Sequence, residues 1–227
     1  MLRITDARTG EPIDAVPARR SLTRVEAHVE RDDLSALRVL LVADVLARTL
    51  ELGGTPVVTV ADPPPELRAR ADALGIRRAE GDRSGAGPAL HVLAPDATAV
   101  DGIRIEVAPV HGTADPALLR MVLLAAPRRQ SVDLAAAAGL DGARETLARW
   151  RKSVATWATR PSKPVPERVR QELRAAWEDD LDVPAVLEVL RRVEHADDVP
   201  DGARFETYAY ADRLLGLELT RDIGAQR

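Results

Sequence analysis

The longest regular pattern of apolar residues lies between residues 32 and 54. Its apolar residues recur at steps of three and four, as on one face of a helix: Leu34, Leu37, Leu41 and Val45. Further aliphatic residues fill most of the other positions, so we expect this helix to be packed on more than one side. Asp32 or Asp33 can cap its first turn, and Gly53 or Gly54 can end it.

Alternating or β-branched runs on both sides of this helix predict strands. One run covers 24–29, directly before the helix, and another covers 57–60, directly after it. Strand, helix and strand at this spacing indicate a right-handed βαβ unit. We expect further strands at 2–5, 89–93 and 103–107.

Helical patterns dominate the rest of the chain. We expect a helix over 66–74 and another starting at Asp115, with no strand after that point; residues 83–88 read as a flexible loop. The predicted fold class is therefore α/β. A Rossmann-type parallel sheet over 1–125 is followed by an α-helical bundle over 126–227.

Composition narrows the possible functions. The net charge of -4 gives no overall attraction to nucleic acid, so contact with RNA would need a local basic patch. With no cysteine, the chain can form neither a disulfide nor a thiolate zinc site. No signal peptide and no apolar run of about 20 residues is present, so we expect a cytoplasmic protein without a membrane span.

One basic stretch is the best candidate for RNA contact. Its cations are Arg149, Arg151, Lys152, Arg160 and Lys163. Trp150 and Trp157 lie among them, but they share a helical stripe with Leu147 and Val154. We therefore expect both tryptophans in the core, with the cations either touching phosphate or forming a solvated helix face.

The histidines offer a second, weaker signal. His28 ends a predicted strand and His91 lies within another. A role in metal binding or acid–base chemistry is open to both, but we expect packed or surface imidazoles.

Three stretches resemble cysteinyl-tRNA synthetases, in the family's order. The first is residues 41–48 in the long helix, with Leu2–Ile4 before it. The second is Asp115–Arg120 with the leucines after it, and the third is Ala176–Pro184, similar to an acidic motif of the helical bundle. The resemblance implies a class I synthetase-like core, a stem-contact region and a bundle. It also implies loss of the connective insertion and of the anticodon-reading domain.

The family's ATP-site signatures are absent. His-Ile-Gly-His should fall at Asp33, Leu34, Ser35 and Ala36, so both histidines are replaced. Lys-Met-Ser-Lys-Ser should fall near Arg104, where only that one cation remains. His28, Asp33, Ser35, Ala36, His91 and Arg104 are thus the remnant pocket positions that the resemblance assigns.

The family's zinc site, which the resemblance describes as two cysteines with His and Glu, has no cysteine here. We therefore expect neither zinc nor ATP as a cofactor and no catalytic residue of the family's reaction. The first hypothesis is a degenerate paralogue, a pseudoenzyme that binds a protein partner, a second copy of itself or a tRNA acceptor stem. The alternative is a ligase or group-transfer enzyme that uses a remodelled pocket in a specialised pathway. The cysteine ligase of mycothiol synthesis shows that a protein of this fold can use a substrate other than tRNA, although that family keeps both signatures.

Overall fold

The structure is a computed structural model that describes residues 1–227 except 17–21, 81–88, 96, 98–100, 136–137 and 226–227. Its described part contains eight strands and seven α-helices. The whole loop predicted at 83–88 lies outside the described residues.

A four-stranded parallel sheet forms the first half of the molecule, in the order β4-β3-β5-β6. The strands are β3 (Thr23–Ala27), β4 (Val57–Val60), β5 (Ala89–Leu93) and β6 (Ile103–Glu106). The first of them, β3, is central, with β4 on one side and β5 on the other. This is the Rossmann-like arrangement that the sequence predicts, and its topological switch point lies between β3 and β5.

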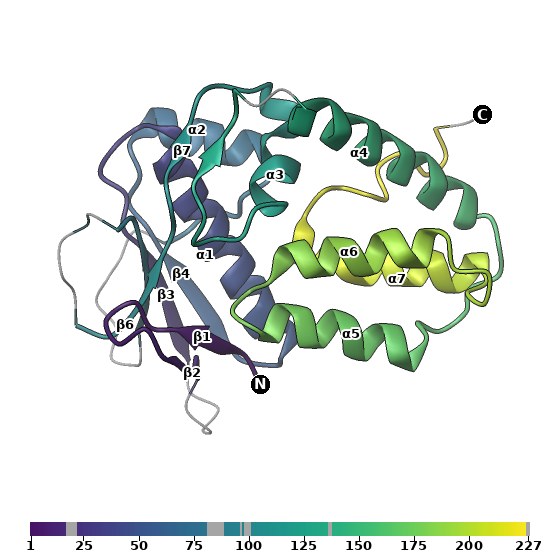
Figure 1. The fold of residues 1–227 in the computed structure, drawn as a ribbon, viewed down its shortest axis with the longest axis horizontal. Helices are drawn as coiled ribbons and strands as arrows, with labels where there is room; N and C mark the ends of the chain where they lie inside the picture. Colours follow the sequence, from purple (N-terminus) through teal and green to yellow (C-terminus); the bar gives the residue numbers. More distant parts are fainter. Residues whose placement is uncertain (17–21, 81–88, 96, 98–100, 136–137, 226–227) are drawn as a thin grey trace.

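Helix α1 (Leu34–Leu52) lies between the sheet and the helical half (Figure 1). Thirteen of its nineteen residues are buried, which confirms packing on more than one side. Its sheet side contacts β3, β4 and β5, and it also contacts α2 (Pro65–Ala73) and α7 (Asp201–Leu215). The helix is thus the shared core element of both halves.

The short strands were predicted only in part, since β1 was expected at 2–5 and the others were not. β1 (Arg3–Thr5) pairs antiparallel with β2 (Pro12–Asp14), and β7 (Val110–His111) pairs parallel with β8 (Val132–Asp133). The expectation of no strand after residue 115 was wrong, because β8 lies beyond α3 (Pro116–Leu124). Two residues are too few to show an alternating pattern.

The second half is a bundle of four helices. They are α4 (Ala138–Trp157), α5 (Glu167–Glu178), α6 (Val183–Glu194) and α7. Trp150 and Trp157 are buried, and their rings contact Tyr208 edge-on at 5.5 and 5.1 Å between centroids. Both tryptophans therefore belong to the core, as expected. No helix in the described part of the chain is long and apolar enough to cross a membrane.

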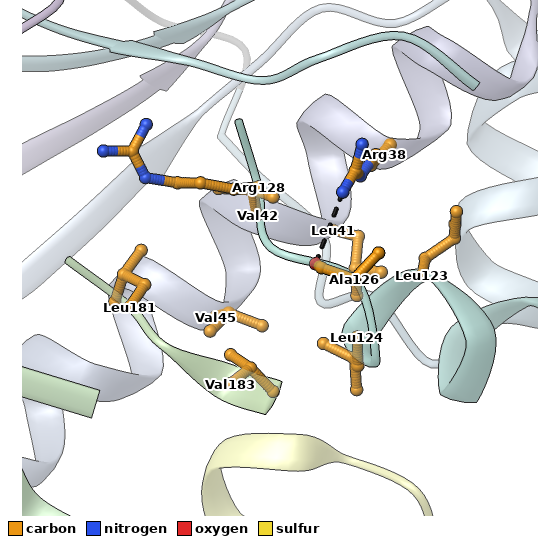
Figure 2. A pocket seen from close by; sticks show the side chains of 10 residues that line it. All are labelled: Arg38, Leu41, Val42, Val45, Leu123, Leu124, Ala126, Arg128, Leu181 and Val183. Carbon is orange, nitrogen blue, oxygen red and sulfur yellow. Dashed lines mark hydrogen bonds between the residues drawn. The ribbon is translucent and has the colours of Figure 1, made fainter. Parts of the chain in front are cut away.

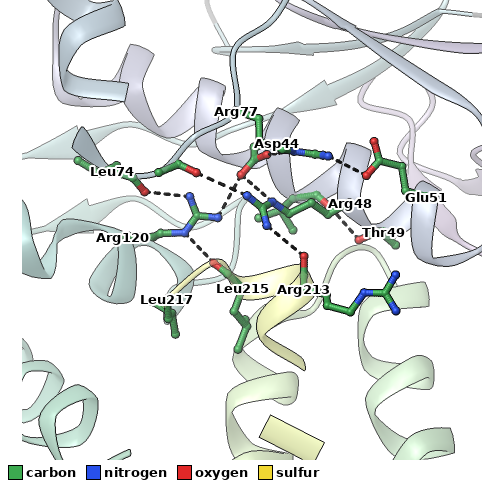
Figure 3. A network of polar contacts seen from close by, with 12 residues as sticks. Asp44, Arg48, Thr49, Glu51, Leu74, Arg77, Arg120, Arg213, Leu215 and Leu217 are labelled. Atoms are coloured by element: carbon green, nitrogen blue, oxygen red, sulfur yellow. Dashed lines mark hydrogen bonds and ion pairs between the residues drawn. The ribbon is translucent and has the colours of Figure 1, made fainter. Parts of the chain in front are cut away.

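A buried ionic network joins the two halves (Figure 3). Asp44 of α1 accepts hydrogen bonds from Arg48, Arg77 and Arg120, at 3.0, 2.8 and 3.1 Å. Arg120 of α3 also donates to the carbonyl oxygen of Leu215 in α7, at 2.6 Å. The buried apolar residues form one continuous core across both halves, so a domain boundary near 125 stays a prediction.

Candidate functional site

One face of the sheet carries polar side chains at its centre. Side chains alternate along a strand, so Glu26 and His28 point to the face opposite Val25 and Ala27. The parallel register places His91 of β5 beside Glu26 of β3. Since doubly wound folds usually cover both faces with apolar contacts, a polar group at the switch point is the first candidate for a site.

Three side-chain atoms converge there. His28 Nε2 lies 3.0 Å from His91 Nδ1, and Glu26 Oε2 lies 3.5 Å from that nitrogen and 4.0 Å from His28 Nε2. The Glu26 and His91 side chains are 8% and 7% exposed, whereas His28 is 21% exposed. The Glu26–His28–His91 cluster is therefore nearly buried and opens to solvent at His28.

Charges around the cluster set its protonation. Burial lowers the pKa of His91, while the Glu26 carboxylate opposes this shift and Arg24 and Arg104 add to it. His91 is thus a neutral imidazole at neutral pH. Arg24 Nη2 contacts the other oxygen of Glu26, Oε1, at 2.5 Å, which leaves Oε2 turned toward the two rings.

The start of α1 follows Glu26 and His28 closely in the chain. The Asp33 side chain accepts a hydrogen bond from the Ala36 amide at 2.8 Å, the capping that the sequence predicts. Asp33 also pairs with Arg31 at 3.0 Å, and Asp32 pairs with Arg70 at 2.9 Å. The Ala36 amide is therefore already bonded within the chain, and the carboxylates of Asp33 and Asp32 are each paired with an arginine.

The other remnant positions have structural contacts. Ser35 Oγ accepts a hydrogen bond from the Val110 amide at 3.0 Å, which ties α1 to β7. Ala36 is buried, and Arg104 lies opposite His91 in the register of β5 and β6. Of the six predicted positions, the structure thus brings His28, His91 and Arg104 to the polar face, and Asp33, Ser35 and Ala36 to the first turn of α1.

An open hollow of about 380 Å³ lies beside that first turn. Asp33 and Leu34 line it at the start of α1, Arg70 in α2, Gly112 before α3, and Pro116 at the start of α3. The size of the hollow suits a small molecule, although the Asp33 carboxylate in its wall is already paired with Arg31.

A second pocket, whose lining residues are drawn in Figure 2, is too small for a ligand. It measures about 20 Å³, roughly the space of one water molecule, and leucine and valine side chains form most of its wall. Arg38 at its edge donates to the carbonyl oxygens of Ala108, Ala126, Pro127 and Gln130, and burial lowers the pKa of Arg38 to about 10. This arginine therefore holds loops together.

The basic stretch on α4 is partly occupied by internal contacts. Arg149 pairs with Glu194 at 2.9 Å, Arg151 donates to the carbonyl oxygen of Leu217 at 2.7 Å, and Arg160 pairs with Asp201 at 3.7 Å. Lys152 and Lys163 are exposed. Three of the five predicted RNA-contact cations thus already have protein partners.

Sequence reasoning missed Glu26 and the meeting of the two histidines. The alternation of Glu26 and His28 on one strand face could have indicated half of the cluster. The other half depends on the register between β3 and β5, which the sequence alone does not show.

No model of a known protein family matches this chain. Two curated proteins match part of it, both named L-cysteine:1D-myo-inositol 2-amino-2-deoxy-alpha-D-glucopyranoside ligase. The protein from Streptosporangium roseum is 35% identical over 122 residues, which are 52% of this chain and 29% of the ligase. The protein from Streptomyces griseus is 38% identical over 109 residues, 46% of this chain and 25% of the ligase. The match thus spans between a quarter and a third of each ligase, and it supports a synthetase-like ligase ancestry.

Proposed function

We propose that this protein is a synthetase-like relative of the cysteine ligases that no longer forms an adenylate and that works in the cytosol by binding a partner. One observation carries the proposal: the Asp33 side chain caps the first turn of α1. In the resembled family this position holds a histidine that serves ATP.

The physical reason lies in the free amides of a helix start. Such amides, with the positive end of the helix dipole, bind phosphate when nothing else satisfies them. Here Asp33 occupies the Ala36 amide and adds a negative charge. Arg31 and Arg70 offset the charges of Asp33 and Asp32, so a triphosphate would meet two ion pairs and one amide donor fewer.

The partner that we propose is a protein, either a second copy of this chain or another chain. RNA is the weaker candidate because binding phosphate would require Arg149, Arg151 and Arg160 to leave their present contacts. Lys152 and Lys163 keep a tRNA acceptor stem open as an alternative. Light scattering and a tRNA mobility shift, run side by side, distinguish the two.

Calorimetry with ATP and Mg²⁺ tests the main proposal. We expect no binding isotherm below the millimolar range, with or without L-cysteine. Micromolar binding of ATP by the unmodified protein would overturn the proposal, because the helix start would then accept a phosphate despite its cap.

A second candidate function is a ligase or group-transfer enzyme that uses the remodelled pocket. The two cysteine ligases and the hollow of about 380 Å³ beside Asp33 and Arg70 favour it. The assay combines ATP, L-cysteine and 1D-myo-inositol 2-amino-2-deoxy-alpha-D-glucopyranoside, with mass spectrometry of the products. A cysteine amide that forms only with the protein present would put this candidate first.

A further inference from the structure

We propose that Glu26, His28 and His91 bind a divalent transition-metal ion, with zinc as the ion that this donor set suits best. Glu26 lies in β3, His91 lies in the neighbouring β5, and His28 directly follows β3, where its amide bonds to the Val92 carbonyl oxygen, so the sheet fixes the three positions. The absence of cysteine led us to expect no zinc, but two imidazoles and a carboxylate need no thiolate.

The distances between the donor atoms fit one ion. Two ligands that lie about 2.0–2.1 Å from a tetrahedral zinc are roughly 3.3–3.4 Å apart. The three donor atoms, Glu26 Oε2, His28 Nε2 and His91 Nδ1, are separated by 3.0, 3.5 and 4.0 Å. Small side-chain movements would therefore place all three on one face of a tetrahedron.

The fourth coordination position would remain open. The cluster is exposed mainly at His28, which gives an ion a path of entry and leaves room for a water molecule or a ligand. Three protein ligands with an open position are typical of catalytic zinc sites, whereas structural sites have four.

Binding also fixes the protonation state of the ligands. A metal needs neutral imidazole and ionised carboxylate. Each ring must keep its remaining proton on the far nitrogen, which is Nδ1 in His28 and Nε2 in His91. Arg24 at Oε1 of Glu26 orients the carboxylate, as partners behind metal ligands commonly do.

Two nearby cations work against tight binding. Arg24 touches Glu26, and Arg104 lies beside His91 in the sheet. Their positive charges lower the affinity of the site for any divalent ion, so we expect micromolar rather than nanomolar binding. The proposal does not rest on the proposed function, since the cluster and the capped helix start consist of different residues.

The test uses untagged, full-length protein stripped with EDTA and titrated with Zn²⁺ by calorimetry and with Co²⁺ by visible absorption. We expect one equivalent of Zn²⁺, intense tetrahedral Co²⁺ bands and a higher Tm with Zn²⁺. His28→Gln and His91→Gln should each abolish all three effects, and Glu26→Gln should weaken them. His195→Gln is the matched control, because His195 is 76% exposed and outside the cluster.

Lack of Zn²⁺ binding by the unmodified protein would overturn the proposal. Unchanged stoichiometric binding in both His28→Gln and His91→Gln would overturn it equally, because the ion would then lie elsewhere. His28 is the most exposed of the three, so His28→Gln should fold even where His91→Gln does not. A variant that no longer binds Zn²⁺ but keeps the Tm of the metal-free unmodified protein has lost the site and not the fold.

Discussion

His28 and His91 lie 3.0 Å apart between ring nitrogens, although 63 residues separate them in the chain. The contact exists because β3 and β5 are parallel neighbours at the topological switch point of the sheet, where ligands of such folds commonly bind. The helix that follows β3 begins with a capped, ion-paired turn. The chain thus runs from a polar cluster at the centre of the sheet into a helix whose first turn is capped by Asp33.

Arg38 should be essential to stability. Its guanidinium is buried and donates to four backbone carbonyl oxygens. Arg38→Met removes all of these bonds, and of the four oxygens that of Pro127 keeps a bond from the Gln130 amide. We expect the free energy of unfolding to fall by about 3–5 kcal/mol in urea denaturation. Arg78→Met is the control, since Arg78 is 75% exposed and should cost less than about 1 kcal/mol. Equal effects of both variants would contradict the structural role of Arg38.

Asp44 should make the free energy of unfolding depend on pH. Burial alone would raise its pKa, but the charges of Arg120 and Arg48 and hydrogen bonds from Arg77 and Arg48 outweigh it, so the pKa lies below its ordinary value of 3.8. The unfolded state then binds more protons, and this stabilisation, present above about pH 5, is lost as the pH falls through the folded-state pKa. Unfolding free energies between pH 7 and 3 should fall less steeply in Asp44→Asn. Asp62→Asn, at a side chain 78% exposed, should keep the slope of the unmodified protein.

The two halves should unfold together through α3. Leu119 and Leu123 are 4% and 3% exposed and belong to the continuous core. Replacement of either by Ala should lower the free energy of unfolding by about 2–5 kcal/mol. Calorimetry should still show a single transition, at a lower Tm. Leu22→Ala, at a residue 54% exposed, should have little effect. Two separate transitions, only one of them shifted, would show independent domains.

The main elements follow from local patterns in the sequence. The period of the apolar residues predicts α1 within two residues at each end, and the β-branched run Val57–Val60 is a strand with the same bounds. The sequence also predicts the cap by Asp33 and the ion pair of Asp44 with Arg48, because both contacts join residues three or four apart.

The candidate site is not local, and for that reason most of it was missed. Glu26 reads as one polar residue of a strand until His91 is placed beside it. Likewise, the sequence indicates only that Arg38 needs water or a partner, and the structure supplies four carbonyl groups from residues 108–130. Such contacts depend on the register and packing of segments far apart in the sequence.

The capped start of α1 gives a prediction about anions. Asp33→Ala should cost about 0.5–2 kcal/mol, because the Ala36 amide loses its acceptor, whereas Asp32→Ala should cost less than about 1 kcal/mol. Replacing both by Asn should let inorganic phosphate bind slightly better, as followed by calorimetry, since two negative charges are removed. Weaker phosphate binding in the double variant would contradict this account of the helix start.

Cysteine-dependent exchange of pyrophosphate into ATP tests the central claim most directly. The reaction requires adenylate formation. In the proposed function, the Asp33 cap and the absence of the resembled family's histidines and lysines remove the groups that would stabilise its transition state. We predict exchange at background for the unmodified protein and for the double Asn variant of Asp32 and Asp33. Exchange that depends on cysteine, rises in proportion to the unmodified protein and exceeds background would contradict the claim that adenylate formation has been lost.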